Sequence, residues 1–253
     1  MPGASHPILL LHGQPGTPRD WDAVVAEIGP RADTLAIRRP GWGPDSSPTG
    51  LEGNARAAIR ALDHAGLKQA VVVGHSLGGA VAAWVAATHP DRVAALILLA
   101  PAANQQSLTA LDRLLAAPVL GDLLSGASLA AAGGVLAARP VRQALAARLG
   151  VAPEYLRAWS GRLASPRAWR SFAAEQRMLV RELPVLETRL AEIGVPTTIV
   201  AGTADRIVPI ASARSLASQI PHAELVELQG GHHVFHQQRP AEVAEIILDA
   251  AGP

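Results

Sequence analysis

Ser76 has the sequence setting that most favours covalent chemistry in this chain of 253 residues. The β-branched run at residues 70–73 leads directly into residues 74–78 (GHSLG), and an alanine-rich helical pattern follows. A strand, a sharp turn and a helix in this order predict a nucleophile elbow, with the serine at the tip of the turn. The flanking glycines avoid side-chain collisions across a strained turn. The N–H groups that begin the helix, with Leu77 first, direct a positive dipole toward the serine oxygen.

A serine nucleophile needs a base and a carboxylate that orients the base. Asp205 is the candidate carboxylate, because it follows the buried-strand pattern of residues 197–201 and ligands gather at the carboxyl ends of parallel strands. The loop after the last strand pattern holds three histidines: His232, His233 and His236. The order serine, aspartate, histidine is that of hydrolases built around such an elbow. No carboxylate lies within a few residues of these histidines, so we expect no metal site.

Buried-strand patterns alternate with helical patterns, which predicts an α/β fold with a mainly parallel sheet of about six strands. The strand patterns are residues 8–11, 34–37, 70–73, 95–99, 197–201 and 224–228. The helical patterns are residues 18–28, 50–65, 77–89, 210–219 and 241–250.

The alternation stops between residues 102 and 190, where prolines and glycines divide a helical pattern into four or five short helices. We expect residues 1–102 and 190–253 to form an α/β core and residues 103–189 to form a helical cap inserted between two of its strands. The alternative is a continuous helical layer of the core.

Two further motifs follow the first two strand patterns: HGQPG at residues 12–16 and RPGWGPDS at residues 39–46. With the elbow, they resemble the α/β-hydrolase superfamily, in particular the serine-nucleophile members of its capped esterase and epoxide-hydrolase-like branch. The resemblance extends over residues 8–102 and 190–250 and is weak across the cap. It implies an α/β-hydrolase fold and a hydrolytic enzyme that needs no cofactor.

The resemblance also distinguishes among the histidines of the last loop. The final motif of the family, counted back from Arg239 and Pro240, implies that His233 is the base and that His236 is a later family histidine. His232 takes the place of the usual glycine and is the alternative base.

The resemblance implies that the backbone N–H of Gln14 joins that of Leu77 in an oxyanion hole. Because a proline follows Gln14, the peptide bond between these two residues is a candidate cis peptide. The candidate substrate-pocket residues are aromatic or imidazole side chains: Trp42, His75, Tyr155, Trp159, Trp169 and Phe172. For the aromatic members, packing within the protein is the alternative.

Two features depart from the family pattern. Relatives that open epoxides or displace halide carry aspartate at the elbow, so Ser76 argues against both reactions. Relatives also carry two more strands before the first motif, whereas eleven residues precede His12. Residues 34–37 would then form an exposed sheet edge, with Arg38 and Arg39 as charged protection, and a homodimer through this edge is a further expectation.

Composition limits the functional classes. Apolar residues make up 49% of the chain and the net charge is +1, which favours a packed globule and argues against nucleic-acid or membrane-surface binding. The chain has no cysteine, which excludes disulfides and a thiolate nucleophile. Residues 1–7 lack the pattern of a signal peptide, so we expect a cytoplasmic protein.

Arginines are concentrated in the expected cap. Residues 139–181 hold nine arginines against two acidic residues, Glu154 and Glu175. A solvated helical face explains this cluster, and attraction of an anionic substrate or an acidic partner is the alternative.

These features predict a hydrolase that cleaves small to medium carboxylic esters through an acyl-enzyme intermediate, with a small ester-like molecule as its partner. The same three residues acting on C–C bonds, on lactones or in perhydrolysis are the second expectation. A non-catalytic ligand receptor is the third.

Overall fold

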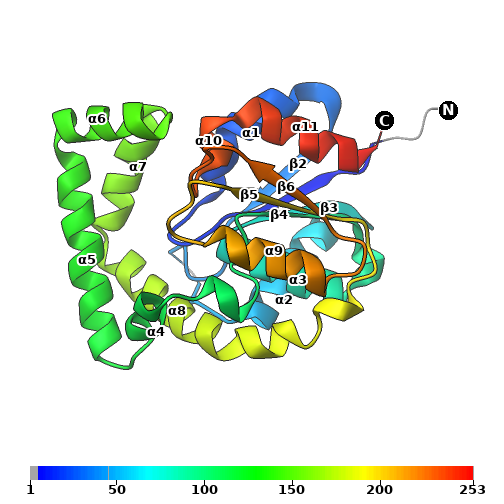
Figure 1. The fold of residues 1–253 in the computed structure, drawn as a ribbon, viewed down its shortest axis with the longest axis horizontal. Coiled ribbons are helices and arrows are strands. Elements are labelled where there is room, and N and C mark those ends of the chain that lie inside the picture. The colour runs from blue at the N-terminus through cyan, green and yellow to red at the C-terminus, as the bar shows by residue number, and fades with distance from the viewer. Residues whose placement is uncertain (1–4, 45, 253) are drawn as a thin grey trace.

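One parallel sheet forms the centre of the computed structural model, which describes residues 5–44 and 46–252 (Figure 1). Within these residues six strands lie in the order β2-β1-β3-β4-β5-β6. Their bounds are Ile8–Leu11 (β1), Thr34–Ile37 (β2), Ala70–His75 (β3), Val93–Leu99 (β4), Thr197–Gly202 (β5) and Glu224–Leu228 (β6). Every neighbouring pair is parallel, so the expected α/β fold with about six strands is confirmed. Residues 1–4, on which the signal-peptide expectation partly rests, lie outside the described residues.

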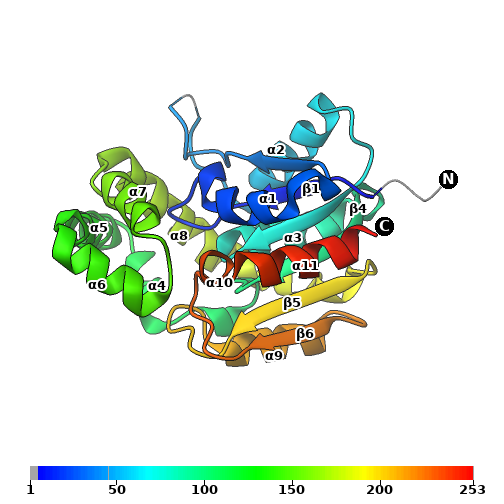
Figure 2. The same ribbon diagram turned by 90° about the horizontal axis from the view of Figure 1, so that it is seen from above.

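Helices cover both faces of the sheet (Figures 1 and 2). One face carries α1 (Asp22–Ile28) and α11 (Pro240–Ala251), and the other carries α2 (Leu51–His64), α3 (Leu77–Thr88) and α9 (Ile210–Gln219). The described residues also form the short helix α10 (Phe235–Gln238) and five 3-10 helices: Pro18–Trp21, Gly29–Arg31, Pro90–Arg92, Gln105–Ser107 and Leu190–Glu192.

The central strands are apolar along their whole length because both of their faces are buried. In β3, Val71 and Val73 pack in the core cluster that includes α1 and α11, whereas Val72 packs with α2 and α3. This alternation follows from the two-residue repeat of a strand. The strand patterns of the sequence therefore identified a sheet that is buried on both sides.

A group of five described helices lies between β4 and β5 in the chain and beside the sheet in space (Figure 1). Their bounds are Ala110–Leu115 (α4), Leu120–Ala137 (α5), Arg139–Leu149 (α6), Pro153–Leu163 (α7) and Pro166–Glu187 (α8). The expectation that all of them are short is wrong, because α5 has 18 residues and α8 has 22. Leu136, Leu156 and Leu163 belong to a small hydrophobic cluster of this group's own.

Helix α8 connects this helical group to the sheet. Leu179, Leu183 and Leu186, near its C-terminal end, pack in the same core cluster as α2 and α3. The N-terminal half of α8 packs instead beside α5 and α7 (Figure 2). One continuous helix therefore ties the helical group to the core of the protein.

Strand β2 lies at an edge of the described sheet and pairs with β1. Of the two arginines that follow it, Arg38 is exposed, but Arg39 is 1% exposed. The expectation that Arg39 protects this edge as a surface charge is therefore wrong. Its guanidinium instead binds the buried carboxylate of Glu175 on α8.

Among the described residues, α5 is the helix that by length and composition alone is long and apolar enough to cross a membrane. It packs beside α7 and α8 as part of the helical group. Its outer side exposes Leu120, Leu123 and Val135.

Candidate active site

The turn between β3 and α3 holds Ser76 in a strained backbone conformation, with φ 55° and ψ −121°. A side chain on either flanking glycine would collide with the backbone, since a Cβ on Gly74 would overlap Gly78 O and one on Gly78 would overlap Leu11 O. The Ser76 N–H donates to the carbonyl oxygen of Leu99 on the neighbouring strand (2.9 Å), which supports the turn. The sequence thus produces a sharp strand-to-helix turn that only small flanking residues permit.

Asp205 and His233 meet at the carboxyl edge of the sheet, where the chain leaves β5 and β6. His233 Nδ1 lies 2.8 Å from Asp205 Oδ2, and the side chains are 11% and 2% exposed. The other carboxylate oxygen, Oδ1, accepts the backbone N–H groups of Ile207 (2.7 Å) and Val208 (3.0 Å). Because every carboxylate oxygen has a donor, the group is fixed in orientation and its hydrogen bond fixes the imidazole of His233.

His232 makes different contacts from those of its neighbour. Its backbone N–H donates to Gln238 Oε1 (2.8 Å), and its ring Nδ1 lies 3.3 Å from the carbonyl oxygen of Ala204. Of the two candidate bases, His233 is therefore the one bonded to Asp205.

His75 joins the loop of His233 to the elbow. The rings of His75 and His233 lie 4.8 Å apart between centroids, and His75 Nε2 donates to the carbonyl oxygen of His233 (2.8 Å). Burial, followed by the neighbouring His236 and His233, lowers the pKa of His75 well below its usual value. The neutral side chain of His75, which directly precedes Ser76 in the chain, thus holds the loop of His233 beside the elbow. Among the described residues, no hydrogen bond joins Ser76 Oγ to the His233 ring, and such contacts often tighten when substrate binds.

His236 forms a buried wall behind His75. Its ring centroid lies 4.3 Å from that of His75 and 5.4 Å from that of Trp21. Burial lowers the pKa of His236 to about 3, with His233 as the lesser cause. His236 is thus a neutral packing residue that supports the histidine next to the serine.

The loop after β1 packs directly over the elbow. A Cβ on Gly13 would lie 3.0 Å from Ser76 Cβ, so this glycine lets the backbone approach the serine closely. The peptide bond from Gln14 to Pro15 is cis. Within the described residues, the backbone N–H groups of Gln14 and Leu77 have no hydrogen-bond partner. Two free donors therefore belong to the two segments that meet at Ser76.

A buried ion pair that the sequence reasoning missed supports this loop. Arg39 donates from Nε to His12 O (2.7 Å) and from Nη2 to Gly13 O (3.0 Å), and it pairs with both oxygens of Glu175. Trp42 Nε1 also donates to Glu175 Oε2 (2.9 Å). Burial raises the pKa of Glu175, and Arg39 opposes that shift. No local pattern could have identified this pair, because its members are separated by 136 residues.

Gln14 makes a second contact with α8 that the sequence reasoning also missed. Its side-chain Nε2 donates to Gln176 Oε1 (2.6 Å), and Gln176 Nε2 donates to Asp112 Oδ1 (3.0 Å) on α4. The loop that carries the free N–H of Gln14 is thus tied to the helical group.

The candidate pocket aromatics of residues 103–189 pack among the helices. Tyr155 and Trp159 lie one helical turn apart on α7, 6.0 Å between ring centroids. They pack against the small hydrophobic cluster of the helical group, as does Val234, the neighbour of His233 in the chain. The indole N–H of Trp169 donates to the backbone at the end of α7, and Phe172 is half-buried on α8. Their contact with a substrate remains a prediction. Asp45 of the second motif lies outside the described residues.

Comparison with known proteins gives the class of this site and fold. The model of the alpha/beta hydrolase family matches residues 8–246. Lipase LipV of Mycobacterium tuberculosis is 31% identical, covering 97% of this chain and 93% of the lipase. The 2-hydroxymuconate semialdehyde hydrolase of a Pseudomonas species is 26% identical over 93% of this chain and 80% of its own length. The crystal structure of a hydrolase from Pseudomonas aeruginosa superposes with a TM-score of 0.77, at 24% identity, covering 98% of this chain and 91% of that one.

These matches define an enzyme of the hydrolase class. The chain belongs to the α/β-hydrolase family, as the resemblance of its motifs implied.

Proposed function

We propose that this hydrolase cleaves small to medium carboxylic esters with Ser76 as its nucleophile. The hydrogen bond between His233 and Asp205, made by loops that meet beside the strained serine, carries the proposal. Similarity to a lipase over nearly the whole chain supports an ester as the bond that is cleaved.

In the proposed mechanism, Ser76 Oγ attacks the ester carbonyl while His233 accepts the serine proton. The histidine then donates this proton to the departing alcohol, and a water molecule hydrolyses the acyl-enzyme. Asp205 holds the required tautomer of the imidazole. The free N–H groups of Gln14 and Leu77 stabilise the oxyanion, each by about 3 to 4 kcal/mol.

We further propose that residues 103–189 act as a cap over this site and residues 1–102 and 190–253 as its core. The packing of Val234 among the helices of this segment supports the proposal, because Val234 adjoins the proposed base. The hydrogen bond from Gln14 to Gln176 supports it from the other side of the site.

Hydrolysis of a series of p-nitrophenyl esters, from acetate to dodecanoate, tests the proposal. We expect the wild type to show an optimum of acyl length, and Ser76→Ala and His233→Ala to lower kcat by about 10⁶. His232→Ala is the matched control, because its imidazole is not bonded to Asp205, and it should keep most of the activity.

Covalent labelling separates the alternatives. A fluorophosphonate should label the wild type at Ser76 and leave Ser76→Ala unlabelled. Substantial ester hydrolysis by Ser76→Ala, or loss of activity in His232→Ala but not in His233→Ala, would contradict the mechanism. Labelling without hydrolysis of any ester would point to another acyl or C–C bond.

A further inference from the structure

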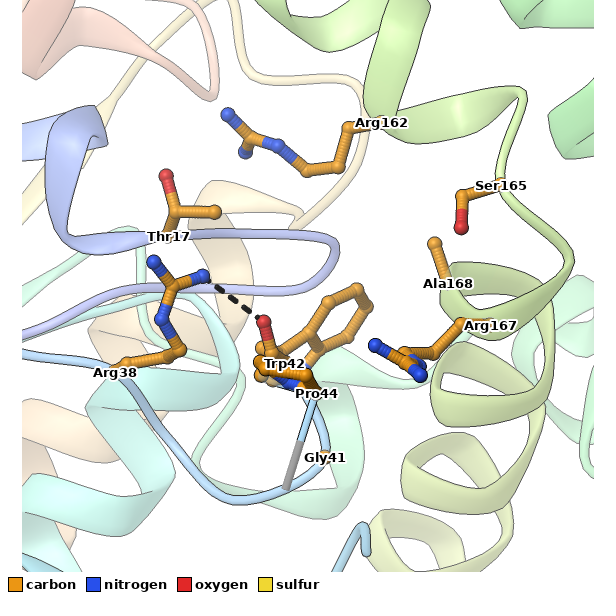
Figure 3. Close-up of a pocket in the computed structure, with 10 residues that line it drawn as sticks. Thr17, Arg38, Gly41, Trp42, Pro44, Arg162, Ser165, Arg167 and Ala168 are labelled. Carbon is orange, nitrogen blue, oxygen red and sulfur yellow. Dashed lines mark hydrogen bonds between the residues drawn. The ribbon is translucent and has the colours of Figure 1, made fainter. Parts of the chain in front are cut away.

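A cavity of about 330 Å³ lies between the core and the corner where α7 meets α8 (Figure 3). Its walls include Thr17, Arg38 and Trp42 from the core and Arg162, Ser165 and Arg167 from the corner of α7 and α8. Ser76, Asp205 and His233 are not among the residues that line it. The cavity is therefore distinct from the catalytic centre proposed above.

Two residues that line the cavity, Arg162 and Trp42, nevertheless contact the loop of Gln14. Arg162 Nη1 lies 3.4 Å from Pro15 O, and the rings of Trp42 and His12 lie 6.4 Å apart. Pro15 follows Gln14 directly and His12 precedes it by two residues. The residues that line the cavity therefore contact the segment that also carries the proposed oxyanion donor.

The lining of the cavity is cationic. Three guanidinium groups surround it, from Arg38, Arg162 and Arg167, and the described residues that line it include no aspartate or glutamate (Figure 3). Arg162 is neutralised by an ion pair with Asp20 (3.0 Å). Arg38 uses Nη1 on the carbonyl oxygen of Trp42 (3.0 Å), which leaves its other guanidinium N–H groups without partners in the described part of the chain. Arg167 makes no ion pair with any described residue.

An uncharged group adds to these guanidinium groups. Ser165 precedes α8, but its hydroxyl makes no hydrogen bond to that helix, and the first turn of α8 holds no acidic residue. The positive end of a 22-residue helix therefore lies at the cavity beside Arg167. The Ser165 hydroxyl, two guanidinium groups and a helix end all favour an anion.

We propose that this cavity binds the anionic group of the substrate, a carboxylate or a phosphate, so that the enzyme prefers esters with a negative charge remote from the bond it cleaves. This inference rests on the proposed ester hydrolysis and adds the substrate class. It also assigns a role to part of the arginine cluster at residues 139–181, because Arg162 and Arg167 belong to that cluster. The cavity has room for such a group and a short linker.

Two methyl esters of equal backbone length, monomethyl glutarate and methyl pentanoate, separate charge from size when acid release is followed in a pH-stat. We expect a lower KM for monomethyl glutarate with the wild type. Arg167→Gln and Arg38→Gln should each raise that KM about fivefold to tenfold and change the KM for methyl pentanoate less than twofold.

Arg148→Gln is the matched control, because it removes an exposed arginine on α6 that does not line the cavity. It should leave both KM values unchanged. Equal increases in all three variants would show that net charge acts at long range, and unchanged KM values in Arg167→Gln and Arg38→Gln would show that the cavity is not used. Either result would overturn the proposal.

Calorimetry separates the failure of this inference from failure of the proposed function. Glutarate and inorganic phosphate are titrated into Ser76→Ala and into the double variant Ser76→Ala/Arg167→Gln. We expect both anions to bind to Ser76→Ala. Their binding to the double variant should be about fivefold weaker or more, and added KCl should weaken binding to Ser76→Ala. Binding that depends on Arg167 without hydrolysis of any ester would refute the proposed function and leave the anion site intact. Binding of phosphate that depends on Arg167, with no preference for the charged ester, would identify a separate anion site and overturn the substrate assignment.

Discussion

At the scale of single residues, substitutions in the ion pair of Arg39 and Glu175 should strongly lower the stability of the fold. Both side chains are 1% exposed, so removal of one leaves the charge of the other buried without its partner. Arg39→Met and Glu175→Leu should therefore each lower the free energy of unfolding by about 3–5 kcal/mol. The double variant should lose much less than the sum, because neither charge then remains. Urea unfolding of the four proteins measures this coupling, and strictly additive losses would contradict it.

Single residues differ in how well the sequence alone predicts their place in the structure. The positions of Ser76 and Asp205 at strand ends could be predicted because each residue stands beside a recognisable strand, and their catalytic roles stay a prediction. His233 could be preferred over His232 through the family motif, and its bond to Asp205 is consistent with that choice. Arg39 was misread as a surface charge because its partner, Glu175, lies far away in the chain and has no local signal of its own.

At the scale of elements, two adjacent glycines in α5 should respond to substitution in opposite ways. A Cβ on Gly133 would lie 3.1 Å from Ala164 N and from Ser160 O, whereas a Cβ on Gly134 would meet no atom within 4 Å. Gly134→Ala should therefore raise the free energy of unfolding by about 0.5–1 kcal/mol, because alanine favours a helix interior. Gly133→Leu should lower it by forcing α5 away from α7. Chemical unfolding monitored by circular dichroism tests both, and stabilisation by Gly133→Leu would refute the close packing.

These two glycines also explain why the helices between β4 and β5 are longer than the sequence predicted. Glycines usually interrupt a helix, so the glycines at residues 133–134 predict a break between two short helices. In α5 the helix continues through them, because Gly133 allows α7 to approach and Ser160 Oγ donates to Gly133 O (2.8 Å). The strands of the core were easier to predict, since their buried runs carry the signal within four to seven residues.

At the scale of the whole molecule, three buried histidines should make stability depend on pH. Burial lowers the pKa of His12, His75 and His236 below the usual value, so the folded chain binds fewer protons there than the unfolded chain. Their contribution is present above about pH 6.5 and is lost as the pH falls below it. For His236, whose pKa falls to about 3, this loss should be about 2 kcal/mol of unfolding free energy between pH 7 and pH 5. The raised pKa values of Asp20 and Glu175 act in the opposite direction, because those carboxyls bind protons more readily in the folded state.

Replacement of one histidine isolates its contribution from that of the carboxyls. His236 is 1% exposed and its ring packs against His75 and Trp21, so phenylalanine can replace it with little change in shape. The carboxyl contributions are common to both proteins and cancel in the comparison. Urea unfolding at pH 7 and pH 5 should therefore show that His236→Phe loses about 2 kcal/mol less than the wild type over this interval. Equal losses in the two proteins would mean that His236 takes up a proton in the folded state, which the buried imidazole stack argues against because a charge there would lack solvation.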